Sequence, residues 1–228
     1  MIEKVLDWLN STAFTSFGAP TTWAEALGFA TGAACVYLVA KQHILNWPLG
    51  IANNLLWIML FATAGLYADS ALQVVYIVLG VWGWWQWLHV GTRRVDRVVT
   101  GTGAREWVVL GAAGIVATGA LTWFLATLTS STVPFWDAVT TALSLMATYG
   151  QAMKRWESWL LWMAADIIYV PLYHSKGLDL TALLYVGFFA LCVKGLVEWR
   201  RDLRARAAAT PAGGQPSYDL TAVDVGRP

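Results

Sequence analysis

Seven stretches of the sequence carry almost no charge over a length that suits a helix crossing a membrane. Each run is close to the ~20 residues that an α-helix needs to span the hydrocarbon core of a bilayer. The runs are continuous rather than alternating, which indicates helices and not strands. We therefore expect an all-α polytopic membrane protein with seven transmembrane helices, at roughly residues 23–40, 49–65, 70–87, 108–128, 135–152, 159–173 and 180–197.

The composition agrees with this fold class, because 57% of the residues are hydrophobic and only 13% are charged. A soluble domain of this size carries about twice that share of charge. Cys35 and Cys192 lie inside apolar runs and are expected to be small apolar fillers, not a disulfide or a metal pair. No cofactor and no metal site are expected.

The two ends of the chain differ from the apolar middle. Residues 1–20 contain acids and lack the long apolar block of a signal peptide. Their apolar residues share one helical face, which predicts a short helix lying in the membrane interface. Residues 207–228 are rich in Ala, Pro, Gly and polar residues and predict a disordered cytoplasmic tail.

Basic residues gather in alternate connections between the runs. With seven spans, one side of the membrane receives Lys41, Arg93, Arg94, Arg97, Arg105, Lys154, Arg155, Arg200, Arg201, Arg204 and Arg206. The other side keeps Lys4 and Lys176. Because cytoplasmic loops carry the excess of Lys and Arg, we expect the N-terminus outside and the C-terminus in the cytoplasm.

The sequence also matches itself without a gap when it is shifted by 112 residues. The matched pairs include Tyr37 with Tyr149, Trp47 with Trp159, Leu66 with Leu178, Gly83 with Gly195, and Trp87 with Trp199. We infer two three-helix repeats, within residues 21–90 and 133–200, joined by a linker transmembrane helix within 104–129. Because one extra span separates the two repeats, both have the same orientation in the membrane. Such parallel repeats form a known transporter architecture, with the substrate site near the midplane.

One face of the run 159–173 carries almost all of its aromatic and ionisable residues. Trp159, Trp162, Asp166, Tyr169 and Tyr173 fall within a sector of roughly 80° on a helix. The corresponding face of the first repeat carries Trp47, Asn54 and Trp57, and Asn54 is equivalent to Asp166. A carboxylate at the centre of a bilayer costs about 3 kcal/mol even on the gentler scale, so it lines a wet cavity or has a partner.

Two interpretations of this face stay open. Asp166 is either part of a ligand path or held by a structural partner, for example the hydroxyl of Thr148, and many of the other tryptophans anchor at headgroups. As candidate substrate-binding residues we take Trp47, Asn54, Trp57, Gln151, Trp159, Trp162, Asp166, Tyr169 and Tyr173. Aromatic faces attract organic cations and flat rings, and carboxylates or amides accept hydrogen bonds from hydroxyls. The combination suits a flat, cationic or neutral heterocycle that carries hydroxyls.

Three segments, WPLGIANNLLW (47–57), VWGWWQW (81–87) and WESWLLWMAADIIYVPLY (156–173), resemble the PnuC family of bacterial vitamin transporters. The resemblance extends over about residues 23–199. The family pattern WxxWxxxN/D occurs here as Trp159, Trp162 and Asp166. This resemblance implies uptake of nicotinamide riboside across the inner membrane by facilitated diffusion, with trapping by a cytoplasmic kinase. It also implies a homotrimer and a fold similar to a full-length SWEET transporter.

Other substrates and other classes of protein remain as alternatives. The wider family includes carriers of thiamine, riboflavin and deoxynucleosides, and the acid Asp166 favours a cation, which both nicotinamide riboside and thiamine are. The sequence has no GxxxxGK[ST] loop, so direct use of ATP is not expected. An intramembrane enzyme would need a catalytic pair that the sequence does not offer, so the protein is not expected to be an enzyme. A channel is distinguished from a carrier by uptake that fails to saturate. No nucleic-acid partner is expected.

Overall fold

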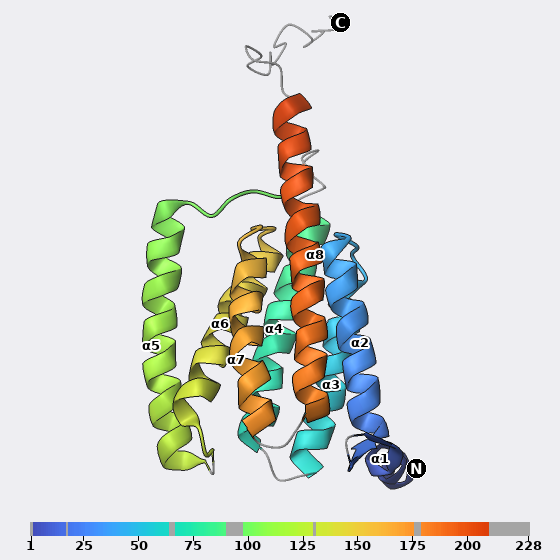
Figure 1. Ribbon diagram of the computed structural model, residues 1–228. Coiled ribbons are helices and arrows are strands. Elements are labelled where there is room, and N and C mark those ends of the chain that lie inside the picture. The colour runs from blue at the N-terminus through green and yellow to red at the C-terminus, as the bar shows by residue number, and fades with distance from the viewer. Residues whose placement is uncertain are drawn as a thin grey trace, which may run out of the picture.

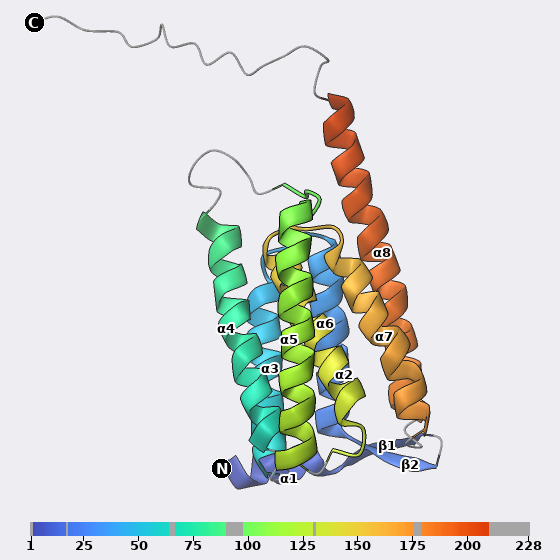
Figure 2. The same cartoon turned by 90° about the vertical axis from the view of Figure 1, so that its left-hand side faces the viewer.

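The structure, a computed structural model, describes residues 2–16, 18–63, 67–89, 98–129, 131–175 and 179–209. Predictions on Arg93, Arg94, Arg97, Lys176 and the tail beyond residue 209 lie outside these ranges. The long helices run side by side in one bundle, α5 stands at its edge, and α8 projects beyond the others (Figures 1 and 2). The elements are α1 (Ile2–Asn10), β1 (Thr12–Ser16), β2 (Ala19–Thr22), α2 (Trp23–Ala40), α3 (Asn46–Thr63), α4 (Tyr67–His89), α5 (Ala104–Leu128), α6 (Pro134–Ala152), α7 (Ser158–Ser175) and α8 (Asp179–Ala209).

Each predicted apolar run coincides with the greater part of one helix. By length and composition, α2, α4, α5 and α8 are able to cross a membrane. The helices α3, α6 and α7 have 18, 19 and 18 residues. Polar residues such as Asn54, Gln151 and Asp166 lower their hydropathy. The protein is therefore a helical membrane protein, and the count of seven spans stays a prediction.

The N-terminal segment is only partly helical, so the prediction of a helix over residues 1–20 was wrong beyond Asn10. After α1 the chain forms an antiparallel hairpin of β1 and β2, with Gly18 at φ 80° in its turn. The threonines of these strands are β-branched and favour extended backbone over helix. Trp8 of α1 stacks on Trp23 at a centroid distance of 5.4 Å, which fixes α1 against the start of α2.

A capping box sets the start of α2. The backbone N–H of Glu25 donates to Oγ1 of Thr22, and the Glu25 carboxylate accepts from the backbone N–H of Thr22 at 2.8 Å. This reciprocal pair satisfies donors that the first turn of a helix leaves open. Glu25 therefore has a structural role at the helix end.

The turns after α2 and after α6 have the same backbone conformation. Gln42 and Lys154 both have positive φ, 54° and 51°, which is uncommon for residues other than glycine. The residues are 112 apart, the offset of the sequence match. Backbone hydrogen bonds correspond at the same offset, as His43 N to Leu38 O and Arg155 N to Gly150 O, and Trp47 N to Ile44 O and Trp159 N to Trp156 O.

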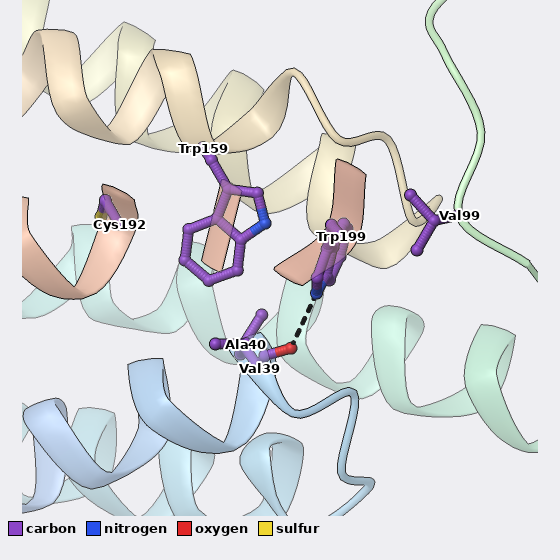
Figure 3. Packing of buried hydrophobic residues seen from close by; sticks show 6 residues of the cluster. All are labelled: Val39, Ala40, Val99, Trp159, Cys192 and Trp199. Atoms are coloured by element: carbon purple, nitrogen blue, oxygen red, sulfur yellow. Dashed lines mark hydrogen bonds between the residues drawn. The ribbon is translucent and has the colours of Figure 1, made fainter. Parts of the chain in front are cut away.

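The same offset relates two buried tryptophan pairs. Trp47 meets Trp87 edge to face at 5.4 Å and 87°, and Trp159 meets Trp199 at 5.5 Å and 87°. The indole of Trp47 lies directly against Gly83, and that of Trp159 lies against Gly195. Figure 3 shows the second pair, with Val39 and Ala40 of α2 packed beside it. Glycine is needed at both places because a Cβ would overlap the ring.

Contacts between the two halves are reciprocal. The indole N–H of Trp199 donates to the carbonyl of Val39 at 3.2 Å (Figure 3). The indole N–H of Trp87 donates to the carbonyl of Gln151 at 3.3 Å. Val39 and Gln151 are also 112 residues apart. In accordance with these bonds, α2 packs on α8 and α4 packs on α6, while α5 packs on α6.

The α2–α3 turn, the α6–α7 turn, the start of α5 and the charged end of α8 lie at one end of the bundle, here called the turn end (Figures 1 and 2). The described basic residues that the sequence assigned to one side, such as Lys41, Arg105, Lys154 and Arg200, belong to these segments. Helix α8 continues to Ala209, so the predicted start of the tail at residue 207 was wrong by three residues.

Candidate functional site

Asp166 lies midway along α7 and only 4% of its surface is exposed. Its Oδ2 accepts a hydrogen bond from the thiol of Cys192 on α8, with 3.6 Å between the heavy atoms. The hydroxyl of Thr148 donates to the carbonyl of Ser144 instead, so the suggestion of Thr148 as a partner was wrong. Cys192 is more than an apolar filler, although a thiol is a weak donor. The acid therefore keeps most of its capacity to accept hydrogen bonds.

Trp159, seven residues before Asp166, has no exposed surface. Its ring fills the space between Gly195 and Trp199, as Trp47 does against Gly83 and Trp87. Both indoles are thus held by packing between neighbouring helices. Their N–H groups are buried and have no hydrogen-bond partner among the described residues.

Trp162 is half-buried and packs against the cluster that contains Trp159 and Cys192. Its indole N–H is buried and, within the described part of the chain, has no hydrogen-bond partner. An unpaired buried donor costs free energy, so it is a place where a ligand or water can bind favourably. Trp162 and Asp166 are four residues apart on α7 and lie on the same face of the helix. Together they offer one donor and one strong acceptor.

Tyr169 and Tyr173 continue this face into a cluster with two aromatic residues of α8. The ring centroids of Tyr169 and Tyr185 are 4.6 Å apart, and Tyr173 stacks on Tyr185 at 5.2 Å and 8°. Phe188 completes the cluster edge to face with Tyr185. The sequence interpretation did not include the α8 residues. The sequence contains little sign of these two residues, because an aromatic residue in a hydrophobic run that packs inside the bundle looks the same as one that faces lipid.

Hydroxyl groups of α6 border the tyrosine cluster. The side chain of Tyr169 lies near that of Thr140, whose hydroxyl donates to the carbonyls of Trp136 and Asp137. Tyr76 of α4 lies near Ser144, one turn further along α6. Thr140 and Ser144 are 1% and 3% exposed, so α6 presents a buried polar strip toward α4 and α7. The sequence interpretation missed these residues, although the 112-residue offset aligns Tyr76 with the aromatic Phe188.

In the first half of the chain, Trp57 lies against Gly28 and stacks on Phe61 at 5.4 Å. The amide of Asn53, a residue that the sequence interpretation did not select, donates to the carbonyl of Gly28 at 3.0 Å and also hydrogen-bonds Thr31. Asn53 therefore ties α3 to α2. Asn54 is half-buried, and its opposition to Asp166 stays a prediction.

The predicted site residues cannot all contact one small ligand. Fourteen residues separate Trp159 from Tyr173, a distance of about 21 Å along a helix. Gln151, which is 8% exposed, lies at the turn end together with Trp47 and Trp159. Asp166 lies between this group and the tyrosine cluster; along the axis of α7 it is about 10 Å from Trp159 and about 5 Å from Tyr169, the nearest tyrosine of the cluster. The candidate site is therefore centred on Trp162 and Asp166, with aromatic residues on either side.

A bundle of apolar helices around a buried acid, an unpaired indole and a strip of hydroxyls has the construction of a membrane transporter. The chain belongs to the nicotinamide mononucleotide transporter family, whose model matches residues 22–201. The resemblance to the PnuC family is thereby confirmed.

Curated relatives of the chain differ in the compounds that their names state. The chain is 27% identical to the riboflavin/roseoflavin transporter RibM of Streptomyces davaonensis over 214 residues, which are 91% of this chain and 100% of RibM. It is 26% identical to the nicotinamide riboside transporter PnuC of Escherichia coli over 219 residues, covering 84% and 90% of the two chains. The PnuC of Neisseria mucosa is 27% identical, covering 80% and 73%.

The fold is similar to the crystal structure of the vitamin B3 transporter PnuC. The TM-score is 0.63 at 23% sequence identity, and the match covers 80% of this chain and 83% of the other. The chain is thus a membrane protein of a vitamin transporter family with the PnuC fold.

Proposed function

We propose that this protein carries nicotinamide riboside into the cell by facilitated diffusion, and that a cytoplasmic kinase traps the substrate by phosphorylation. The observation that supports this most directly is Asp166, a buried carboxyl in mid-helix whose described protein partner is a single thiol. A buried carboxylate with so weak a partner is costly unless a ligand or water completes its hydrogen bonds.

The neighbours of Asp166 suit the two parts of a nucleoside. In this proposal the carboxylate accepts hydrogen bonds from ribose hydroxyls and balances the positive pyridinium ring. The ring packs against Trp162, and the indole N–H donates to the substrate. Trp159 and Trp47 support the site by packing rather than by direct contact. Tyr169, Tyr173 and Asn54 border the path, and Gln151 and Trp57 lie further along it.

The charge of the substrate distinguishes nicotinamide riboside, the proposed substrate, from riboflavin, the second candidate. Nicotinamide riboside and thiamine are cations, whereas riboflavin has a larger neutral ring system. An acid in the site favours a cation, since a neutral ligand would leave the carboxylate charge without compensation. Riboflavin is the second candidate because RibM, a relative over its whole length, is named for it.

The proposed architecture is seven transmembrane helices in two parallel repeats of three, separated by α5, with the turn end in the cytoplasm. It is supported by the 112-residue offset between the turns, the tryptophan pairs and the reciprocal indole bonds. We also propose the homotrimer that the resemblance implies. An apolar groove of about 450 Å³ between α5 and α6 supports it, since it leaves a surface for a neighbour.

The test is a calorimetric titration of purified protein with nicotinamide riboside, thiamine and riboflavin. Proteoliposomes without any ion gradient are then assayed for saturable uptake of the ligand that binds. We expect binding of nicotinamide riboside that weakens in Asp166→Asn, because the charge is lost. Riboflavin binding that is unaffected by Asp166→Asn would transfer the proposal to a neutral substrate. Strict dependence on a sodium or proton gradient would overturn downhill transport.

A further inference from the structure

Lys154 bridges the two halves of the molecule at the turn end. Its Nζ donates to Oε1 of Gln42 at 3.0 Å and lies 4.6 Å from the ring centroid of Trp87. The amide nitrogen of Gln42 in turn donates to a carboxylate oxygen of Asp202 on α8 at 3.4 Å. Both Lys154 and Gln42 are half-buried. The two turns are thus joined side chain to side chain.

Two further bonds surround this contact. The Trp87 indole reaches the carbonyl of Gln151, three residues before Lys154, and the Trp199 indole reaches the carbonyl of Val39, three residues before Gln42. The three contacts join the two halves at the turn end. A substrate that moves between the halves toward this end meets them after it leaves Asp166.

The two turns are held very differently. A strap of residues 99–102 crosses the α6–α7 turn, where Thr100 N donates to the carbonyl of Lys154 at 3.1 Å. Arg155 donates to Oγ1 of Thr100 at 2.6 Å, and Glu157 accepts from both the N–H and the hydroxyl of Thr102. Val99 of the strap is 1% exposed and belongs to the buried cluster that contains Trp159 and Trp199.

The α2–α3 turn has weaker ties among the described residues. Beyond the Gln42 contacts and the Trp199 bond, its described side-chain bonds are an exposed ion pair of Lys41 with Glu198 at 3.0 Å and local bonds of His43 and Asn46, whose carbonyl also accepts from the thiol of Cys35 at 3.2 Å. A single exposed ion pair contributes little. The α6–α7 turn is therefore the more firmly held of the two, and the α2–α3 turn is the one that moves more easily.

We propose that the contact between Lys154 and Gln42 is the gate of the turn end, and that the substrate leaves when the α2–α3 turn swings away from the strapped α6–α7 turn. This inference rests on the proposed transport function. It assigns Lys154 and Gln42 to the rate of passage and not to the binding of substrate. A charged hydrogen bond of this kind is strong enough to close the path and weak enough to break in each cycle.

The first test separates rate from affinity. Lys154→Met and Gln42→Leu are reconstituted, and substrate exchange and calorimetric affinity are measured. We expect the exchange rate to change about fivefold or more in either variant, with affinity within about twofold of the parent, because one hydrogen bond to a charged group is worth about tenfold or more. The matched control is Lys41→Met, an exposed lysine one residue before Gln42, whose exchange rate should stay unchanged. Equal rates in all three variants, or a loss of affinity that accounts for the change in rate, would overturn the gate.

The second test asks whether joining the two turns covalently stops transport. Cysteines introduced by Gln42→Cys and Lys154→Cys are joined by a reversible bifunctional thiol reagent, and the link is detected by mass spectrometry, with the parent protein as background control. We expect the linked protein to bind substrate and not to transport it, and a reductant to restore transport. Full transport by linked protein would refute the gate. If the double-cysteine variant links but neither it nor the parent protein transports any of the candidate vitamins, the proposed function would be refuted instead.

Discussion

Lys154 and Gln42 are separated by 112 residues, the offset that aligns the two halves of the chain, and their side chains meet at 3.0 Å. In a two-fold arrangement a residue can contact its own equivalent only close to the axis. The contact therefore marks where the proposed axis emerges at the turn end. Both turns lie at the same end of the bundle (Figures 1 and 2), which agrees with parallel rather than inverted repeats.

The packing of indoles on glycine gives a prediction for stability. In Gly195→Ala the new Cβ would lie 2.5 Å from the ring of Trp159, which also meets Trp199 edge to face. We expect a loss of about 1 to 3 kcal/mol, the usual cost of overpacking a close-packed core. Thermal unfolding in detergent measures it. Gly187→Ala is the control, because a Cβ there meets nothing within 4 Å, and an equal drop in both variants would contradict the assignment.

The centre of the candidate site is tested by truncating its two polar groups. Trp162→Ala and Asp166→Ala should each weaken binding of nicotinamide riboside by about tenfold or more, since a hydrogen bond to a charged acceptor is worth about 1.5 to 3 kcal/mol. Ile167→Ala serves as the control, because this neighbour is 60% exposed on the outer surface of α7. Parent-like affinity in both variants, measured by calorimetry on folded protein, would mean that acid and indole are only packing.

The N–H of Trp162 can be tested apart from its ring. Trp162→Phe keeps an aromatic face and removes the donor that has no described protein partner. We expect affinity between that of the parent and that of Trp162→Ala, because stacking is retained and one hydrogen bond is lost. If the phenylalanine variant binds as tightly as the parent, the indole N–H does not contact the substrate.

The strap across the α6–α7 turn makes a further prediction. Glu157 is 8% exposed, and its carboxylate accepts hydrogen bonds from the N–H and the hydroxyl of Thr102 at 2.8 and 3.1 Å. Glu157→Gln removes the charge of this carboxylate. We expect a loss of roughly 1.5 to 3 kcal/mol in unfolding free energy. Glu198→Gln, which breaks an exposed ion pair with Lys41, should cost less than 1 kcal/mol. Comparable losses in the two variants would show that the strap adds no rigidity.

The orientation of the bundle is open to a reporter experiment. A reporter joined to the chain beyond α8 should be active in the cytoplasm, because the Arg-rich end of α8 obeys the positive-inside rule. Activity on the periplasmic side would contradict both the orientation and the odd number of spans.

The apolar runs predicted most of the helices because an uncharged stretch of this length has few other stable forms in a membrane. They missed the last twelve residues of α8, which contain charged pairs such as Asp202 with Arg206 at 3.1 Å. Helix outside the membrane follows local pairing, which hydropathy does not register. The hairpin after α1 was also missed, because β-branched threonines and a turn at Gly18 are local features that hydropathy does not register.

The candidate site was harder to predict, because a helical face identifies direction but not depth or neighbours. Trp159 and Asp166 share a face, yet one fills a slot at Gly195 and the other reaches Cys192. The sequence did contain a signal for the slot, since Gly83 and Gly195 recur at the same offset as Trp47 and Trp159. Tyr76 and Thr140 enter the site only because helices far apart in the sequence pack together. No local sequence pattern indicates this packing.

The reciprocal indole bonds have a consequence for the ancestry of the chain. Trp87 donates to the second half as Trp199 donates to the first, and the accepting carbonyls of Gln151 and Val39 are themselves equivalent. Each half thus carries both a donor and its matching acceptor, so it is self-complementary, as a subunit of a two-fold homodimer must be. A gene for a single half could have encoded such a dimer before duplication and fusion, and α5 would then be the later insertion that kept both copies in the same orientation.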